Sequence, residues 1–435
     1  MKKVLIISYY FPPGNFAGSY RIKSWADHLY KFGYYPIIVT RHWDENQTDY
    51  TAISSKKSIE KEENESFTVY RLPYKGTPRD KLIARYGSKA KFPGKVLSFF
   101  QLLCQNFSLV CNPMSGLYSF SREYLINNPD VELVLCSGRP FIQFQFCNSL
   151  KKEFLHIKWI ADYRDEWNSQ PKEYYKRISP KLRFLSLIES KFERKWVKSA
   201  SLITTVSEEI RKRIIDFNHF QGNSDVVLNG FETSDFPDEL LQKLPDPSKF
   251  RIFHGGSLYT YQNLKIFAMG FIKFLDAVKG KEDSVELIFE GLNADPEIHS
   301  WLLSNFKDVQ SNISIYPRSE KSEYLLRMRN SHILLVFPYN ALKGTFSSKI
   351  FEYLPMGRPV LMAPSDDGII TKLLQETKTG FVADDADAVC DFLVNKFQDL
   401  INGNFSLSAP DEKVRIYSRE KQTKIMAEAI DRLLH

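Results

Sequence analysis

The sequence is poor in cysteine and contains no long hydrophobic run. Its five cysteines in 435 residues form no C-x-x-C pair, and an odd number of scattered cysteines argues against a disulfide framework and against a zinc site. No stretch reaches the roughly 18 uninterrupted apolar residues that a membrane-spanning helix needs. These absences exclude a disulfide-stabilised secreted module and an integral membrane protein, and they indicate a reducing compartment. We therefore expect a cytoplasmic protein.

Other familiar signals are also missing. The first apolar run, Val4–Ser8, is short and meets Phe11-Pro12-Pro13-Gly14 without a small-residue cleavage site, so it is not a signal peptide. We interpret it as a buried parallel strand. The chain has no internal repeat, no low-complexity tract and no nucleic-acid-binding motif. We expect no nucleic-acid partner, because basic charge alone is weak evidence for one.

Positive charge is concentrated in the first half of the chain. Residues 1–250 carry 37 Lys and Arg against 28 Asp and Glu, whereas the whole chain has a formal net charge of +7. Residues 71–95 contain eight basic residues and one acid, and the apolar residues 96–110 follow directly. Residues 71–110 thus have the composition of a segment that binds an anionic membrane surface, where each cation contributes about 1 kcal/mol. A solvated face followed by an ordinary packed helix is the alternative.

Short apolar runs alternate with amphipathic stretches, which is typical of an α/β protein with crossover helices. The turn-rich segment Leu244–Ser248 separates two series of runs. We predict two doubly wound, Rossmann-like domains, residues 1–245 and 246–410, and a charged C-terminal helix, residues 411–435, that packs across the domain junction and returns to the first domain. The expected strands are Val4–Ser8, Pro36–Val39, Leu133–Cys136, Trp159–Asp162, Leu202–Thr205 and Val226–Leu228, and then Arg251–His254, Val285–Glu290, Ile313–Tyr316, Ile333–Phe337, Pro359–Met362 and Gly380–Val382.

The most informative segment follows the expected strand Ile333–Phe337. A glycine-containing loop leads into a short helix that starts at Ser347 and Ser348. A helix start favours a phosphate through its unpaired N–H groups and its dipole. Lys349 adds a cation, and Glu352, one turn further on, has the chemistry to accept hydrogen bonds from both hydroxyls of a ribose. A capped surface helix with an exposed Lys and Glu is the alternative interpretation.

This segment resembles the donor-binding motif of glycosyltransferase family 4, in which such a helix carries a ribose-binding Glu and ends at G-x-P-V, here Gly357-Arg358-Pro359-Val360. Other pieces resemble the family in the same order across almost the whole chain. They are Tyr9–Pro13 with Gly18, Ser19 and Arg21, then Ser137–Pro140, Asp162–Trp167, Thr204–Ser207, Asn229–Phe231 and His254–Leu258.

The resemblance implies the GT-B fold, in which two Rossmann-like domains face each other across a cleft. It also implies a retaining, metal-independent glycosyltransferase without a cofactor, which moves a sugar from a UDP- or GDP-sugar to a glycan or lipid-linked acceptor in the synthesis of cell-surface polysaccharide or glycoconjugate. Such an enzyme would be cytoplasmic or peripheral on the inner face of a membrane. The expected site residues are Asp165, Arg164 and Lys349 for catalysis, Gly18, Gly256, Ser257, Arg318, Gly344, Thr345, Ser347, Ser348, Lys349 and Glu352 for the donor, and Ser19, Arg21 and Arg139 for the acceptor.

The donor motif departs from the family pattern at two places. Many members have a second Glu that precedes the ribose-binding one with seven residues between them, and Gly344 stands at that position in this chain. Backbone N–H groups of Gly344 and Thr345 are the substitute that we expect. The Arg and Lys that clamp the diphosphate in many members correspond here to Ser257 and Gln262. We expect the clamp to be formed instead by Lys349, the first amides of the helix and Arg318.

A third departure leaves the chemistry open. Where some members have a His-Asp pair, this chain has Arg164-Asp165, and a structural ion network that includes Asp162 is the alternative to a catalytic role. A nucleotide-sugar 2-epimerase of the same fold is a second candidate function, although the loops offer few acid/base residues for it. A non-catalytic GT-B protein that binds a glycan or a partner is the third, and the missing Glu, Arg and Lys agree with it.

Overall fold

The computed structural model describes residues 1–45, 52–171, 179–237, 241, 243–292, 296–339 and 344–435. The chain forms two compact units: unit 1 comprises Met1–Leu228 and Glu420–His435, and unit 2 comprises Asn229–Arg419. The sequence prediction divided the chain after residue 245 instead. The chain leaves the first sheet earlier, because residues 229–237 already pair within unit 2, where Phe231 and Ser418 form a β-bridge.

Unit 1 is built on an eight-stranded sheet in the order β3-β4-β2-β1-β5-β6-β7-β8, in which only the pair β3 and β4 is antiparallel. The central strands β1, β5 and β6 are buried along most of their length because both faces of the sheet are covered. The strands are β1 (Lys2–Ile7), β2 (Tyr34–Arg41), β3 (Glu60–Glu63), β4 (Thr68–Leu72), β5 (Leu133–Gly138), β6 (Lys158–Tyr163), β7 (Leu202–Thr205) and β8 (Asn223–Val226).

The helices of unit 1 fall into two layers. One hydrophobic cluster joins α1 and α17 to the face of the sheet that presents Val4 and Ile6, and the other joins α4, α5, α7 and α8 to the face that presents Leu5 and Ile7. The helices are α1 (Ala17–His28), α2 (Pro78–Tyr86), α3 (Lys91–Phe107), α4 (Ser115–Asn127), α5 (Phe144–Glu153), α7 (Pro180–Val197), α8 (Glu208–Asn218) and α17 (Arg419–Leu434).

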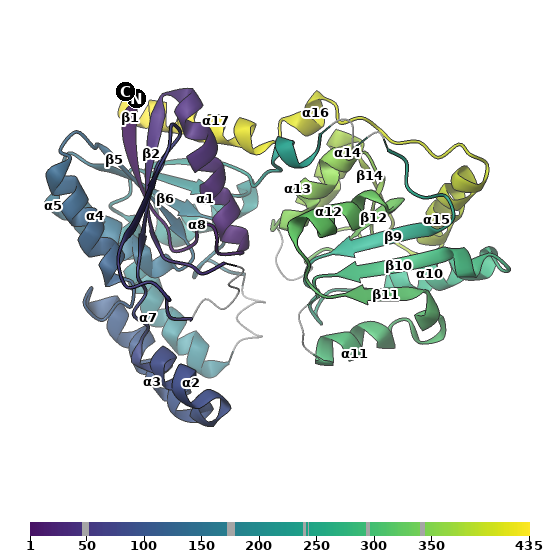
Figure 1. Cartoon of the computed structure of the whole chain (residues 1–435), viewed down its shortest axis with the longest axis horizontal. Coiled ribbons are helices and arrows are strands. Elements are labelled where there is room, and N and C mark those ends of the chain that lie inside the picture. The colour runs from purple at the N-terminus through teal and green to yellow at the C-terminus, as the bar shows by residue number, and fades with distance from the viewer. Residues whose placement is uncertain (46–51, 172–178, 238–240, 242, 293–295, 340–343) are drawn as a thin grey trace. The chain divides into compact units, whose positions relative to one another are not determined.

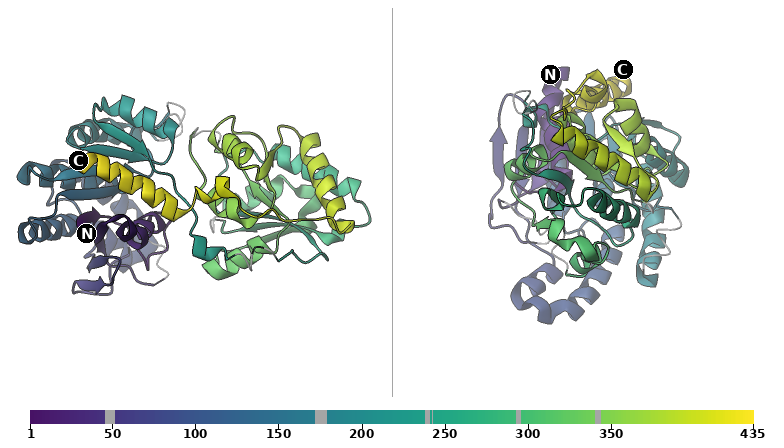
Figure 2. Two further views of the ribbon diagram at one scale, coloured as in Figure 1. Left: turned by 90° about the horizontal axis from the view of Figure 1, so that it is seen from above. Right: turned by 90° about the vertical axis from the view of Figure 1, so that its right-hand side faces the viewer.

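Helix α17 returns to the first sheet from the far end of the chain. Met426 and Ile430 are fully buried in the cluster with β1, and the hydroxyls of Ser24 on α1 and Thr423 on α17 lie 3.2 Å apart. Figure 2 shows α17 in yellow along unit 1. The predicted return of the C-terminal helix to the first domain is confirmed, since it completes one face of the sheet.

Two strands of unit 1 were not predicted. All four residues of strand β3 are charged, and β4 begins just before the basic segment 71–95 and extends into it. The two strands pair antiparallel with Glu60 opposite Arg71, and Arg71 forms an ion pair with Glu62 at 2.7 Å. Charged residues on an edge strand discourage further pairing, so this edge gave no apolar signal. The last predicted strand, Val226–Leu228, lies earlier, as β8, because the chain turns out of the sheet there.

Unit 2 contains a six-stranded parallel sheet in the order β11-β10-β9-β12-β13-β14. Helices α10 and α15 pack with this sheet in one core. The strands are β9 (Phe250–Gly255), β10 (Val285–Glu290), β11 (Ile313–Tyr316), β12 (Ile333–Val336), β13 (Val360–Met362) and β14 (Gly380–Val382). The helices are α10 (Lys265–Ala277), α11 (Pro296–Ser304), α12 (Lys321–Arg329), α13 (Ser348–Tyr353), α14 (Ile369–Thr377), α15 (Ala386–Ile401) and α16 (Glu412–Arg415).

Both sheets have a point at which the strand order reverses. In unit 1 the chain builds outward from β1 through β2 to β4 and then crosses back to β5; in unit 2 it builds from β9 to β11 and crosses back to β12. Segments that leave the carboxyl ends of the two strands at such a point diverge, and ligands of open α/β sheets bind in the crevice between them. The candidate site residues are therefore expected beyond β1 and β5, and beyond β9 and β12.

Candidate functional site

The turn after β9 is built from glycine. Gly256 has φ +112°, a conformation that other residues rarely adopt, and its N–H donates to the carbonyl of Glu290 at 2.8 Å. A Cβ at this position would lie 3.4 Å from Cγ of Lys349. The bare backbone of Gly256 thus lets the Lys349 side chain, which comes from beyond β12, cross the end of β9. Ser257 follows in a half-buried position.

Lys349 and Glu352 form an ion pair one helical turn apart. The Lys349 Nζ donates to the Glu352 carboxylate at 3.0 Å and lies 4.2 Å from the centre of the Tyr324 ring. About a third of the Lys349 side chain and a fifth of the Glu352 side chain are exposed. An ammonium has three N–H donors and a carboxylate has several acceptor sites, so one contact between them leaves capacity for a ligand on both.

Two tyrosines, Tyr353 and Tyr324, pack beside this ion pair. The Tyr353 hydroxyl accepts a hydrogen bond from the Gly255 N–H at 2.8 Å, and the buried Tyr324 ring packs against the Phe253 ring of β9. Burial, together with the nearby Glu352, Tyr353 and Glu290, raises the pKa of Tyr324 well above its usual value. Tyr324 is therefore a neutral phenol that holds the Lys349 ammonium by its ring face. No sequence signal marked it, since an isolated Tyr on a short helix reads as a core residue.

The remaining predicted donor residues are less closely grouped. Gly344 has φ +83° and leads through Thr345 to Ser347, whose hydroxyl accepts from the Lys349 N–H at 3.4 Å as the N-cap of α13. Ser348 is the first residue of that helix. Residues 340–343 of the predicted loop lie outside the described residues. Arg318 is exposed beyond β11, two strands away from β9, and no contact joins it to Lys349.

Helix α13 is only six residues long, so its dipole is weak and falls off within the first turn. The predicted phosphate contact at this helix therefore depends mainly on the charge of Lys349.

His254, the fifth residue of β9, is buried beside the glycine turn. Its Nδ1 lies 2.9 Å from the carbonyl of Leu335, and burial lowers its pKa to about 4. The ring is therefore neutral at pH 7, with the proton assigned to Nδ1 by that hydrogen bond. Its Nε2 is buried without a hydrogen-bond partner among the described residues. His254 can thus accept a hydrogen bond, but it is not a general acid.

A cavity of about 690 Å³ in unit 2 lies away from these residues. Its wall includes the ion pair of Arg251 and Glu286 (3.2 Å), from the amino-terminal ends of β9 and β10. None of the predicted donor residues lines it. The carboxyl edge of the sheet, and not this cavity, carries the candidate donor chemistry, because the glycine turn and the Lys349 pair are there.

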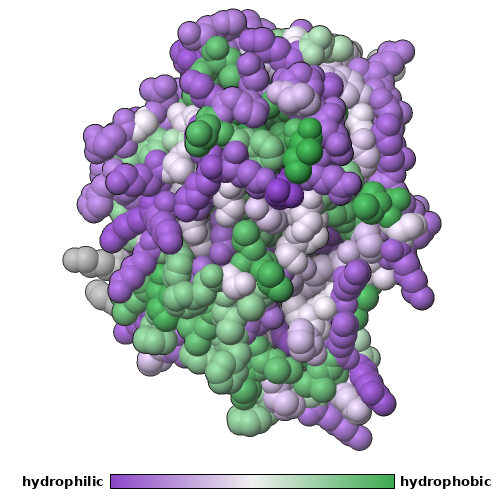
Figure 3. All heavy atoms as spheres, turned by 90° about the vertical axis from the view of Figure 1, so that its left-hand side faces the viewer, coloured by the Kyte–Doolittle hydropathy of each residue, from purple (hydrophilic) through white to green (hydrophobic). Residues whose placement is uncertain are grey.

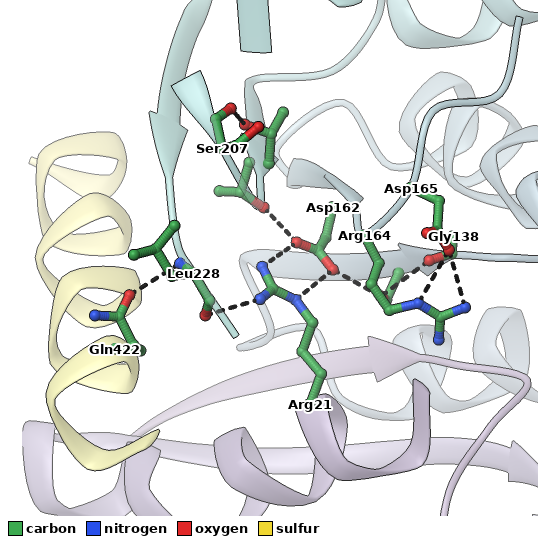
Figure 4. A network of polar contacts seen from close by, with 11 residues as sticks. Arg21, Gly138, Asp162, Arg164, Asp165, Ser207, Leu228 and Gln422 are labelled. Atoms are coloured by element: carbon green, nitrogen blue, oxygen red, sulfur yellow. Dashed lines mark hydrogen bonds and ion pairs between the residues drawn. The ribbon is translucent and has the colours of Figure 1, made fainter. Parts of the chain in front are cut away.

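In unit 1 the charged residues near the reversal point belong to two groups. The first is a buried network in which Arg21 donates to both carboxylate oxygens of Asp162, at 2.8 and 3.1 Å, and to the carbonyl of Leu228 at 3.1 Å (Figure 4). Asp162 also accepts from Ser137 and Thr204, at 2.7 and 2.8 Å. This group ties α1, β5, β6 and β7 together.

The contacts of Arg21 in this network are those of a structural residue. Its side chain is 3% exposed and that of Asp162 is fully buried. Their contacts are those of the structural ion network weighed for Asp162, and nothing around Arg21 supports the predicted contact with an acceptor. Ser19 is likewise buried, and its hydroxyl has no hydrogen-bond partner among the described residues.

The second group is accessible. Arg164 donates to the Asp165 carboxylate at 3.3 Å (Figure 4). Arg139 reaches the same carboxylate at 3.8 Å. A Cβ on Gly18 would lie 1.7 Å from Nη1 of Arg164, so the glycine makes room for the guanidinium on the first turn of α1. Two cations, one carboxylate and a helix start meet here. The structure thus brings together four of the residues that the sequence assigned to catalysis, donor and acceptor.

Aromatic residues that the sequence did not single out border this group. Arg164 lies 5.7 Å from the Tyr10 ring, which stacks on Trp43, and Arg41 lies 3.8 Å from the Trp43 ring. A Cβ on Gly14 would meet Trp43 at 2.8 Å. The aromatic run Tyr9–Phe11 followed by glycine was the available signal, and it was used only as part of the resemblance to the family's loop after the first strand.

Within the described residues, no group of three or more His, Cys, Asp and Glu side chains lies close enough to hold a metal ion. The expectation of metal-independent chemistry stays a prediction.

Several solved structures resemble the chain over its whole length. A sucrose-phosphate synthase from Thermosynechococcus elongatus aligns with a TM-score of 0.64 at 13% identity, over 100% of this chain and 99% of that one. An α,α-trehalose-phosphate synthase (UDP-forming) from Burkholderia xenovorans, in complex with glucose-6-phosphate, aligns with 0.61 at 12%, over 100% of both chains. A trehalose-6-phosphate structure from E. coli, bound with UDP-2-fluoro glucose, aligns with 0.57 at 11%, over 99% and 98%.

No family model and no curated protein sequence matches the chain. At these identities the structural likeness shows the fold alone. The predicted fold class, two Rossmann-like domains of the GT-B type, is confirmed.

Proposed function

We propose that this protein is a glycosyltransferase whose unit 2 binds the nucleoside diphosphate part of a UDP- or GDP-sugar. The single observation that carries the proposal is the Lys349 and Glu352 pair beside the Gly256 turn, at the reversal point of the second sheet. A diphosphate attracts the Lys349 ammonium, and the ribose hydroxyls donate to Glu352. The UDP-forming and UDP-sugar-bound proteins of like fold agree with such a donor.

The acceptor in this proposal carries a phosphate and binds to unit 1. Arg164 and Arg139 share one carboxylate, Asp165, and Arg164 lies on the positive end of α1. A cation at that end of a helix is unfavourable by itself, so an anion that binds Arg164 and Arg139 beside the first turn of α1 is stabilised. A sugar phosphate, as in the glucose-6-phosphate complex, and a phosphate-linked lipid glycan both supply this chemistry. The second agrees with the expected cell-surface glycoconjugate product.

The chemical step that we propose is metal-independent transfer with retention, as the resemblance to glycosyltransferase family 4 implies. Negative charge develops on the departing diphosphate, and a preorganised cation lowers its energy. Lys349 supplies that cation, because the Tyr324 ring and Glu352 hold its ammonium in one place. Asp165 holds the two arginines for the acceptor. No observation on the described residues favours the 2-epimerase.

Calorimetric titration with UDP, GDP and ADP tests the donor site. We expect UDP or GDP to bind, and Glu352→Gln and Lys349→Met each to weaken binding roughly 10- to 100-fold, the usual loss for one hydrogen bond to a charged group. Lys396 and Asp399 form a matched control, since this pair on α15 has the same i,i+3 spacing and a distance of 2.9 Å. Lys396→Met should bind like the wild type.

Failure of all three nucleotides to bind, or equal binding by Glu352→Gln and the wild type, would sink the donor assignment. If a nucleotide binds but no sugar is transferred to phosphate-bearing acceptors, the donor assignment holds and the acceptor proposal fails. Formation of an epimerised sugar without any acceptor would mean that the protein is a 2-epimerase and not a transferase.

A further inference from the structure

Helix α3 exposes large apolar side chains along one stripe. Phe92, Val96 and Phe100 recur at every fourth residue and so share a face of the helix, and Phe107 continues this face at its end. Phe92 is 78% exposed and Phe107 is 71% exposed, and Val110, just beyond the helix, is 87% exposed. A stripe of this kind is the reverse of a packed surface helix, which turns its apolar side inward.

Helix α7 lies against α3 and extends the same surface. The Phe107 ring of α3 meets the Phe192 ring of α7 with centroids 4.9 Å apart, and Lys181 lies 4.6 Å from the Phe99 ring. We call the combined surface the α3/α7 face. Its exposed apolar residues are Phe92, Val96, Phe100, Phe107 and Val110, and from α7 Leu182, Phe184 and Leu187.

Figure 3 shows this side of unit 1, where hydrophobic residues gather in a broad area with hydrophilic residues along its border. Proteins that stay monomeric in water rarely expose a contiguous apolar area of this kind without a use for it. The sequence analysis had expected a basic segment and a neighbouring apolar one, but it placed nothing on α7.

Charge of one sign accompanies the apolar residues. The chain has no Asp or Glu from Lys81 to Arg122, and the one acid on α2, Asp80, is buried and accepts hydrogen bonds from Thr77 and Tyr74. The solvent-facing charges of this stretch are therefore all positive. The exposed cations on α2, α3 and the turn between them are Lys81, Arg85, Lys89 and Lys95.

The two acids of α7 are turned inward. Glu193 is fully buried and accepts from Tyr163 and Asn168, and Glu189 accepts from the Trp167 indole at 3.0 Å. The outward side of α7 is left with Lys181, Arg183 and Lys191 beside its apolar residues. The outward sides of these two adjacent helices therefore carry cations and no acids. Such a surface attracts anions.

We infer that the α3/α7 face docks on an anionic lipid bilayer, with its apolar side chains at the boundary of the acyl chains and its cations among the headgroups. Interfacial helices bind membranes through this combination of buried apolar area and attraction to anionic lipids. No helix among the described residues is long and apolar enough to cross a membrane. Docking in the plane of the interface is the mode that remains for these residues.

A second copy of the chain fits this surface less well. A two-fold interface brings the same patch of both copies together, so the cations around the α3/α7 face would meet one another without acids to neutralise them. A bilayer with anionic headgroups supplies the opposite charge over the whole face at once. Charge complementarity therefore selects the bilayer.

Co-sedimentation of the full chain with vesicles tests the docking. We expect binding to vesicles of phosphatidylcholine mixed with phosphatidylglycerol, weaker binding to phosphatidylcholine alone, and a decrease with added salt. Lys81→Glu with Arg85→Glu should lower the partition coefficient about tenfold or more. The triple variant Phe92→Ser, Phe100→Ser and Leu187→Ser should lower it by a similar factor at every salt concentration.

Matched controls lie on unit 2. Met269 is 57% exposed on α10 and Lys279 is exposed nearby, so Met269→Ser and Lys279→Glu should leave vesicle binding unchanged. Because vesicle binding needs no nucleotide, its failure is distinguishable from failure of the donor site. Absence of binding to anionic vesicles overturns the inference, as does equal binding by the triple variant and its controls. Dimers that form without lipid and dissociate in the triple variant also overturn it, by making the face a protein interface.

Discussion

The two units contain the same kind of sheet but use the charges at its reversal point differently. In unit 1, Arg21 and Asp162 are buried and pair with each other through two hydrogen bonds. In unit 2, Lys349 and Glu352 pair through one contact and stay partly exposed. The first pair is enclosed by α1, β6 and their neighbours, whereas the second lies on one turn of a short helix.

The difference teaches which charges are available for a ligand. Burying an ion pair costs desolvation that only close, multiple hydrogen bonds offset, so such a pair has no capacity left over. A half-exposed pair gains little from its own contact and can exchange that contact for a phosphate or a hydroxyl. In unit 1, the charged side chains that a ligand can reach are accordingly those of Arg164, Asp165 and Arg139, which lie outside the buried Arg21 network.

The largest effect is expected from breaking the buried pair. Arg21→Met leaves the Asp162 carboxylate buried without its cation, which should lower the free energy of unfolding by about 3–5 kcal/mol. Lys349→Met removes a half-exposed i,i+3 pair and should cost less than about 1 kcal/mol. Urea unfolding of both variants, followed by tryptophan fluorescence, measures the contrast. Equal losses would mean that the two ion pairs contribute equally to stability, which would contradict the distinction between a buried structural pair and an exposed pair available to a ligand.

A smaller effect should distinguish the units by the pH dependence of stability. Unit 2 buries His254 and His332, and burial lowers the pKa of each to about 4. The unfolded chain then binds more protons than the folded one between pH 4 and about 6.5, so stability from each histidine is lost as pH falls through that window, by about 3 kcal/mol. His332→Gln should flatten the loss on the acid side.

Unit 1 should respond in the opposite direction. Burial raises the pKa of Glu193 to about 7, so the folded chain binds the extra proton, and the stability from this group is full below about pH 4.5 and is lost as pH rises to 7. Glu193→Gln should remove this loss. Urea unfolding at pH 5, 6, 7 and 8 gives both slopes. A wild-type slope that neither variant changes would contradict the assignment of these groups.

The smallest effect on stability, and a specific one on activity, is expected from Gly18→Ala. The new methyl group occupies the place of the Arg164 Nη1 atom, but that atom ends a flexible side chain that can move. Stability should change by less than about 1 kcal/mol, while the KM for a phosphate-bearing acceptor rises and nucleotide affinity stays constant. Alanine at Gly116, where the nearest atom to a new Cβ would be Leu72 Cδ2 at 4.0 Å, is the control. An unchanged KM would mean that Arg164 does not contact the acceptor.

The sequence predicted the sheet strands well where both faces are apolar and poorly where they are not. The described strands of unit 2 were anticipated within a few residues, because each contains a short apolar run, which is buried in β9, β10, β12 and β13. The charged strand β3 was missed since its pairing depends on Arg71 of β4, and no local pattern reports a partner. The helix α17 was anticipated from its amphipathic pattern, as was its return to the first sheet.

The candidate site was predictable only where the contributing residues are close in sequence. Lys349 and Glu352 lie on one helical turn, so spacing alone places them side by side. Tyr324 and Gly256 belong to other elements, and their contact with Lys349 follows from the strand order β9-β12. The same limit applies to α7, whose exposed apolar residues gain meaning only beside those of α3.

By itself, the sequence determined two doubly wound units and a glycine turn and helix at the reversal point of the second, because hydrophobic period, glycine position and helix spacing are local properties. Only the tertiary structure decided that Arg21 is a structural residue and Arg164 an accessible one. Arg21 meets Asp162 across 141 residues of chain, and which of several arginines obtains the buried carboxylate depends on how α1 packs against β6. It likewise decided which faces of α3 and α7 stay exposed, since burial is a property of the packed sheet and helices together.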